Sequence, residues 1–183
     1  MAYGFLDNVI GGSVATVAGI AALALIAFAL IYILGEAEGR RTGTRDPALG
    51  VKIATAMLAT IAFQMALLGL TALLTGAFLG AGRFVSKPAG GMLLGALVAG
   101  VLPVSIYLTR LRTRGGYPVG RKAIGLNAIV AGIVFTVVTI SFVTMVVSGA
   151  EVDGFIAAWL IYGATTVTTL IYLVPPQGVQ ENA

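Results

Sequence analysis

Five long stretches of uncharged, mostly apolar residues dominate this chain of 183 residues. They cover residues 9–34, 53–81, 89–109, 123–148 and 155–174. A helix of about 20 such residues spans the hydrocarbon core of a bilayer. A strand of a membrane β-barrel would instead alternate apolar and polar residues, and none of the five stretches does so. The sequence therefore predicts an all-α integral membrane protein, a bundle of five transmembrane helices.

The composition excludes a water-soluble or disordered chain. Hydrophobic residues make up 58% of the sequence and charged residues 10%, and the mean hydropathy is +1.02. A soluble domain has about 25% charged residues, and a disordered chain has low hydrophobicity. The longest connection between two stretches, residues 35–52, holds only 18 residues. We therefore expect residues 1–183 to form a single transmembrane domain, with no soluble domain.

The distribution of basic residues predicts the orientation of the helices. Of the 11 Lys and Arg residues, nine lie in residues 35–52 and 110–122, and only Arg83 and Lys87 lie between the second and third stretches. Loops rich in Lys and Arg stay in the cytoplasm. The first and third connections are therefore predicted to be cytoplasmic, which puts the N-terminus outside and the C-terminus in the cytoplasm.

The N-terminal residues do not resemble a cleaved signal peptide. Residues 1–8 hold Asp7 and no Lys or Arg, whereas a signal peptide begins with a basic region. We therefore expect the first helix to be retained. The frequent use of Ala, Gly and Arg indicates a GC-rich bacterial source, and the expected location is the bacterial cytoplasmic (inner) membrane.

The first two helical hairpins resemble each other. An Ile-Tyr pair lies near the end of the first and third stretches, at Tyr32 and Tyr107, and each following loop contains Arg and Gly before Pro47 or Pro118. One interpretation is a parallel repeat of the kind found in transporters, with a fifth helix appended in a 2+2+1 arrangement. The alternative is that any two cytoplasmic loops under the same charge rule share these residues.

Two lines of polar side chains follow the second and fifth stretches. At 100° per residue, each line falls along one face of its helix. The line in the second stretch consists of Thr60, Gln64, Thr71 and Thr75. The line in the fifth stretch consists of Tyr162, Thr165, Thr169 and Tyr172. An amide without a partner in hydrocarbon costs several kcal/mol, so Gln64 requires a neighbouring helix, water or a ligand. The two lines predict either a hydrogen-bonded seam between helices or a narrow polar path for a solute.

Small residues form further faces. Gly residues let two helix backbones approach closely in lipid, and those at helical spacing are Gly69, Gly76, Gly80, Gly91, Gly95, Gly125 and Gly132. They predict close packing within the chain or a contact between subunits. Pro103 lacks an N–H and is expected to kink the third helix.

Residue types that are absent limit the chemistry. The chain has no Cys and no His, and no Asp, Glu, Lys or Arg lies within the five stretches. Proton-coupled transport generally depends on an ionisable side chain inside the membrane, and a nucleophilic or general-base site is poorly supplied. We therefore predict no catalytic, cofactor or metal site, and no enzyme activity.

The basic loops face the membrane surface. Arginines that could contact anionic lipid headgroups or an acidic partner are Arg40, Arg41, Arg45, Arg110, Arg112 and Arg114. The topology rule alone also accounts for them. They are spread over separate loops rather than gathered in one surface, so nucleic acid is not an expected partner.

Two hypotheses for the function remain open. The first is a non-catalytic, helix-packing subunit of a membrane assembly, which oligomerises with itself or with other membrane subunits in the bilayer. The alternative is a channel or facilitator for an ion or a small neutral solute, with a path lined by Thr, Gln and Tyr. An enzyme acting on lipid is a distant third.

Overall fold

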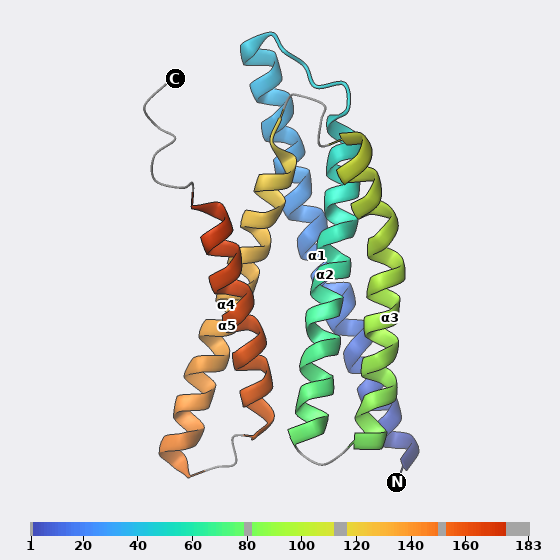
Figure 1. The fold of residues 1–183 in the computed structure, drawn as a ribbon, viewed down its shortest axis with the longest axis vertical. Coiled ribbons are helices and arrows are strands. Elements are labelled where there is room, and N and C mark those ends of the chain that lie inside the picture. Colours follow the sequence, from blue (N-terminus) through green and yellow to red (C-terminus); the bar gives the residue numbers. More distant parts are fainter. Residues whose placement is uncertain (1, 79–81, 112–116, 150–152, 175–183) are drawn as a thin grey trace. The chain divides into compact units, whose positions relative to one another are not determined.

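The residues that the structure describes form five long helices (Figure 1). The computed structural model describes residues 2–78, 82–111, 117–149 and 153–174, and the side chains of 18–77, 89–111, 117–149 and 155–174. The helices are α1 (Ala2–Thr42), α2 (Leu49–Phe78), α3 (Gly82–Ile106), α4 (Val119–Ser148) and α5 (Asp153–Leu173), with a π-helical turn η1 (Tyr107–Leu111) directly after α3. No β-strand occurs among these residues.

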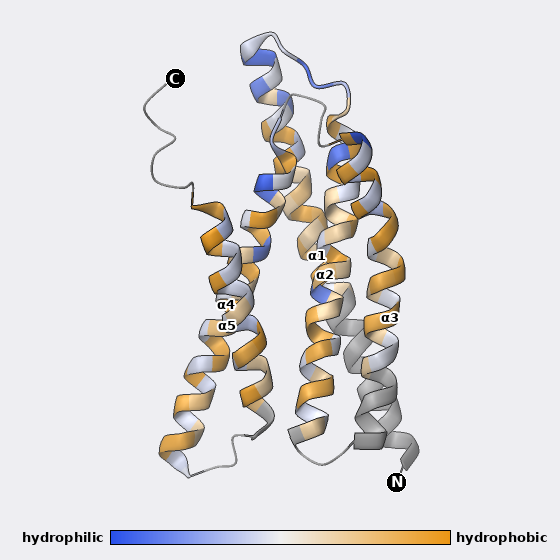
Figure 2. Cartoon of the chain, viewed as in Figure 1, coloured by the Kyte–Doolittle hydropathy of each residue, from blue (hydrophilic) through white to orange (hydrophobic). Residues whose placement is uncertain are grey.

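All five helices are long and apolar enough to cross a membrane, which confirms the predicted class of protein. The segments that meet this test are Ala18–Thr42, Leu49–Ala77, Ala89–Leu111, Val119–Ser148 and Phe155–Leu173. Apolar residues run along the helices, whereas hydrophilic residues gather at the end of α1 and in the loop that follows it (Figure 2).

The helices extend beyond the uncharged stretches. α2 begins at Leu49 instead of residue 53 and so includes Lys52, and α4 begins at Val119 instead of residue 123. The backbone hydrogen bonds of a helix do not require apolar side chains. A charge in the sequence therefore marks where a helix leaves the hydrocarbon, and the helix itself continues.

Pro103 is followed by a change in helix geometry. α3 ends at Ile106, and residues Tyr107–Leu111 form the π-helical turn, in which hydrogen bonds join residues five apart. Pro103 removes one donor from the α-helical ladder. The side chain of Leu111, at the end of this turn, is buried.

The described helices divide into two compact units. The first comprises residues 1–65 and 96–119, and the second comprises residues 66–95 and 120–183. The first therefore contains α1, the first part of α2 and the last part of α3, and the second contains the rest of α2 and α3 together with α4 and α5.

Close packing of side chains against glycines holds the first unit together. A Cβ atom on Gly100 of α3 would lie 3.1 Å from the Cβ of Ala62 on α2. A Cβ on Gly35 of α1 would lie 3.0 Å from Leu49 and 3.3 Å from Tyr117. α1 ends at Thr42, and the next residue, Gly43, has a φ of 71°, the left-handed conformation that commonly terminates a helix.

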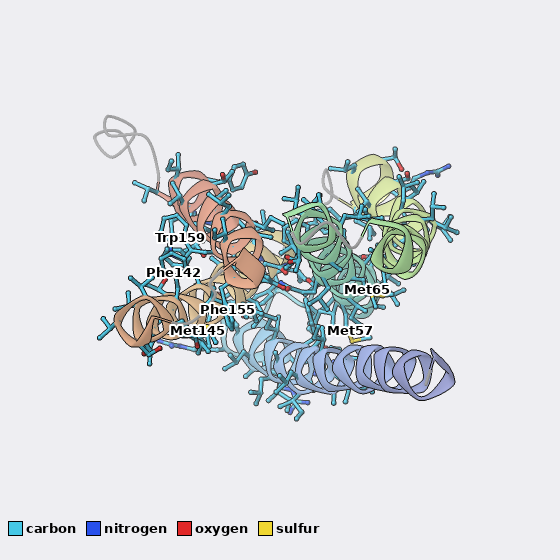
Figure 3. All side chains as sticks on the ribbon, turned by 90° about the horizontal axis from the view of Figure 1, so that it is seen from below. Met57, Met65, Phe142, Met145, Phe155 and Trp159 are labelled. Atoms are coloured by element: carbon cyan, nitrogen blue, oxygen red, sulfur yellow. The ribbon has the colours of Figure 1, made fainter. Side chains whose placement is uncertain are left out.

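The second unit has an apolar core. The buried residues Leu67, Ala131, Ile161 and Tyr162 pack together, with Leu74, Val134 and Phe135 against them. Phe142 on α4 and Trp159 on α5 are labelled in Figure 3, and their ring centroids lie 6.4 Å apart. The indole Nε1 of Trp159 donates to Thr139 Oγ1 at 3.1 Å, and Arg121 Nη2 donates to the carbonyl of Leu173 at 3.2 Å.

The contact at Gly163 tests how α4 and α5 pack. We expect Gly163→Ala to lower the free energy of unfolding by about 1–3 kcal/mol, because the new Cβ would lie 2.9 Å from the Phe135 ring. That ring is held against Trp159, with the centroids 5.8 Å apart. Trp159 fluorescence during unfolding by sodium dodecyl sulfate measures the change.

Gly125→Ala on α4 is the matched control. Nothing lies within 4 Å of a Cβ at Gly125, and Ala favours a helix by up to about 1 kcal/mol over Gly. This variant should be as stable as the natural chain or slightly more so. Equal destabilisation of the two variants would contradict the proposed packing.

Candidate functional site

Two predicted polar residues of α2 are buried in the first unit. Thr60 is 5% exposed and Gln64 is 2% exposed, and both interact with other groups of the chain. Thr55, five residues before Thr60, is also buried, and its hydroxyl donates to the carbonyls of Val51 and Lys52 at 2.8 and 3.0 Å. The first half of α2 therefore carries polar groups that are satisfied inside the protein.

The other half of the α2 line lies in the second unit. Thr75 takes part in an interaction, whereas the Thr71 Oγ1 atom is buried without a hydrogen-bond partner. Thr71 lies one helical turn from Leu67 and from Leu74, which belong to or pack against the apolar core. A hydroxyl in such surroundings is unusual, because it loses its hydrogen bonds to water and gains none.

The polar line of α5 separates into buried and exposed parts. Tyr162 belongs to the apolar core of the second unit, whereas Tyr172 is 71% exposed. Thr169 donates to the carbonyl of Thr165 at 2.7 Å. Thr166, beside this line, donates to the carbonyl of Tyr162 at 2.7 Å. These hydroxyls bond to their own helix, which threonines in membrane helices commonly do.

The predicted glycines have different environments. Gly69 on α2 packs closely on α3, where a Cβ would lie 3.0 Å from the Leu93 side chain and 3.1 Å from the Ala89 carbonyl oxygen. Gly76 is buried. By contrast, Gly91 and Gly95 are exposed with nothing within 4 Å of an added Cβ.

The remaining predicted glycines lie on α4 or outside the described residues. Gly125 has open space around it, and a Cβ on Gly132 would meet Thr166 Cγ2 at 3.8 Å, an ordinary contact. Gly80 lies outside the described residues. The close approaches at Gly35, Gly100 and Gly163 were not predicted. The approach at Gly100 had a signal in the sequence, because Ala96 and Gly100 are two small residues four apart.

The predicted arginines lie at the polar ends of the helices. Arg40, Arg41, Arg45 and Arg110 are exposed. Arg112 and Arg114 lie outside the described residues.

A buried ion pair next to the first loop was not predicted. Lys52 Nζ lies 2.7 Å from Asp46 Oδ2, and the two side chains are 4% and 7% exposed. The backbone N–H of Ala48 donates to Asp46 Oδ1 at 2.9 Å, and that of Leu49 donates to the Asp46 carbonyl at 3.1 Å. Asp46 therefore caps the start of α2 and also neutralises Lys52.

The surroundings of Asp46 favour its ionised form. Burial raises the pKa of the carboxyl, but the hydrogen bond from Lys52, those from the backbone of Ala48 and Tyr117, and the charge of Lys52 together lower the pKa below 3.8. The Asp-Pro sequence at a helix start was a signal for the cap, since Asp is a preferred N-cap residue. Nothing in the sequence indicated that Lys52, six residues later, would pair with Asp46.

A cleft of about 460 Å³ lies beside this ion pair. It is formed by the end of α1, the loop that follows and the segment before α4, and its lining residues are Gly35, Glu38, Gly39, Thr42, Thr44, Arg45, Asp46, Pro47, Tyr117 and Pro118. None of them belongs to the two predicted polar lines. The cleft lies within the first unit.

Neither a metal centre nor a relative identifies the chemistry. Within the described residues, no three Asp and Glu side chains are grouped so as to hold a metal ion. No known protein family, curated protein or solved structure matches the chain significantly.

The Asp46–Lys52 pair makes stability depend on pH. Because the pKa of Asp46 is below 3.8 in the folded protein, its contribution is complete above that pH and is lost as the pH falls through the lower, folded value. We expect Asp46→Asn to remove this step and to lower the free energy of unfolding at pH 7 by about 3 kcal/mol, because Lys52 then stays buried without its counter-ion.

A double variant separates charge from packing. Thermal unfolding between pH 3 and 7 should show Asp46→Asn with Lys52→Met to be more stable than Asp46→Asn alone, since no uncompensated charge remains. If Asp46→Asn matches the natural chain at every pH, the ion pair does not stabilise the loop.

Proposed function

We propose that the chain is a non-catalytic, helix-packing subunit of a membrane assembly, which binds a second copy of itself through α3. The single observation that supports this proposal is the open face at Gly91 and Gly95. These residues are four apart, and nothing lies within 4 Å of a Cβ on either. Ala99, four residues further along, is also exposed. We call Gly91, Gly95 and Ala99 the small-residue face.

Large side chains border this face. Leu94, Val98 and Leu102 are 68%, 73% and 67% exposed. A strip of small residues beside large apolar ones lets a second helix approach closely and gain van der Waals contact, which is the main source of helix association in lipid. A neighbouring side of α3 is already used, because Ala89 and Ala96 are buried.

The proposed location and orientation rest on charge. We place the protein in a bacterial cytoplasmic membrane with the N-terminus outside. The support is the excess of Lys and Arg in residues 35–52 and 110–122 over the other connections. Arg40, Arg41 and Arg110, which are exposed, would then lie at the anionic cytoplasmic surface.

A substitution on the small-residue face tests the subunit proposal. We expect native mass spectrometry of the gently solubilised protein to detect more than one copy, and Gly95→Leu to weaken the association about tenfold, an overpacking cost of about 1.4 kcal/mol. Gly19→Leu on α1 is the matched control, since Gly19 also has nothing within 4 Å. A natural chain that is monomeric with nothing bound would refute the proposal.

The second candidate is a channel or facilitator for an ion or a small neutral solute. The observation that favours it is the buried Thr71 hydroxyl without a partner, which leaves a polar group able to bind water or a solute within a helical bundle. Gln64 and Thr60 are buried on the same helix.

Flux into liposomes tests this second candidate. We expect Thr71→Val and Gln64→Leu to reduce solute or ion flux, because each removes a polar group from the path. Thr144→Val is the control, since Thr144 is exposed on α4 and its hydroxyl bonds to the carbonyl of Ile140 at 2.8 Å. Flux no greater than in empty liposomes would exclude a channel.

A further inference from the structure

The cleft of the first unit has a preformed frame. Gly43, with φ of 71°, turns the chain away from α1. The loop then lies directly against Gly39, where a Cβ would be 3.3 Å from the Thr44 carbonyl oxygen and 3.5 Å from Arg45 Cα. The ion pair between Asp46 Oδ2 and Lys52 Nζ, which lie 2.7 Å apart, fixes the other end of the loop. A ligand would therefore meet a cleft that requires little ordering on binding.

Two opposite charges line this cleft without pairing. Glu38 and Arg45 both belong to its lining and are exposed. Neither forms an ion pair in the part of the chain that the structure describes. The Arg45 Cγ would lie 3.8 Å from a Cβ on Gly39, so the arginine stem packs against α1 at the residue that follows Glu38.

The threonine hydroxyls leave a hydrogen-bond acceptor in the cleft. Thr42 Oγ1 donates to the Glu38 carbonyl at 2.9 Å, which uses its single hydrogen. In the 2.7 Å contact between Thr42 and Thr44 the donor must then be Thr44. Thr44 Oγ1 keeps its lone pairs and can accept a hydrogen bond from a ligand.

The charges of the lining favour a zwitterion over an anion. Within the lining, Glu38 offsets Arg45, and the third charge, Asp46, is already paired with Lys52 outside the lining, so a purely anionic ligand would gain no net attraction. The apolar stretches before and after this loop end at Leu34 and begin at Ile53. The residues between them should therefore lie at the level of the lipid headgroups, where hydrophilic residues gather at the end of α1 (Figure 2).

We propose that this cleft binds the headgroup of an aminophospholipid of the phosphatidylethanolamine type, with Arg45 on the phosphate and Glu38 on the primary ammonium. The guanidinium matches two phosphate oxygens. A primary ammonium has three N–H donors, as a lysine does, and these suit the Glu38 carboxylate and Thr44 Oγ1. A trimethylammonium group has no such donor. The volume of about 460 Å³ falls in the range of small-molecule sites.

Lipid exchange followed by native mass spectrometry tests the proposal. The protein is incubated in micelles that contain equal amounts of phosphatidylethanolamine, phosphatidylcholine and phosphatidylglycerol, and the retained lipids are counted. The natural chain should retain phosphatidylethanolamine about tenfold more than either other lipid, since a charged hydrogen bond contributes about that factor. Glu38→Gln should lose the preference over phosphatidylcholine, and Arg45→Gln should lose retention of both.

Controls separate specific headgroup binding from general adhesion of lipid to the apolar helices. Arg41→Gln changes an exposed arginine outside the lining and should keep the preference, and circular dichroism should give all three variants the same helix content. Soluble phosphoethanolamine should displace the lipid only weakly, because it lacks the acyl chains. Equal retention of the three lipids, an unchanged preference in Glu38→Gln, or displacement by phosphoethanolamine as strong as by the lipid would each overturn the proposal.

Discussion

A bilayer offers its helices no hydrogen-bond partners, and most polar groups of the described helices are satisfied within the chain for that reason. Threonine hydroxyls illustrate this, because each of a series donates to the carbonyl four residues earlier. The series is Thr55, Thr136, Thr139, Thr144, Thr166 and Thr169. A threonine hydroxyl that donates to a carbonyl of its own helix needs no partner in the lipid. Many threonines are therefore compatible with these membrane-spanning helices.

The same solvent removes the hydrophobic advantage of burying apolar side chains, so helices associate where their backbones can approach closely. Within the first unit Gly100 serves this purpose against Ala62, and within the second Gly163 does so against Phe135. Helices α1 to α5 remain largely covered by exposed Leu, Ile and Val, which suit lipid tails. Gly91 and Gly95 have the same property as the packed glycines but no neighbour, and this difference is the basis of the proposed self-association.

The helices were predictable because each corresponds to a long uncharged stretch of the sequence. An uncharged stretch of about 20 residues has few alternatives to a membrane span, and all five appear as long apolar helices. The boundaries were less predictable, because the backbone hydrogen bonds of a helix such as α2 continue through a charged residue such as Lys52. Helix periodicity places Thr60 and Gln64 on one face, and both are buried.

What the sequence could not give was contact between segments far apart in the chain. The Asp46-Pro47 sequence is typical of a turn or a helix start, but the pairing of Asp46 with Lys52 and its hydrogen bond from the backbone of Tyr117 depend on tertiary structure. The cleft beside them is likewise formed by segments about 70 residues apart, such as Arg45 and Tyr117. Glycine spacing identified which helices carry small residues, but whether a glycine is packed, as Gly69 is, or open, as Gly95 is, depends on the neighbour.

Distance measurement between two copies tests the proposed role of α3 most directly. The chain has no Cys, so a single spin label can be attached at Leu94→Cys, beside the small-residue face, or at Ile133→Cys on α4, which is also exposed. Pulsed electron spin resonance in liposomes should give a short, narrow intermolecular distance for the label at position 94 and a longer or broader one for position 133. Only a concentration-dependent background at both positions would contradict self-association through α3.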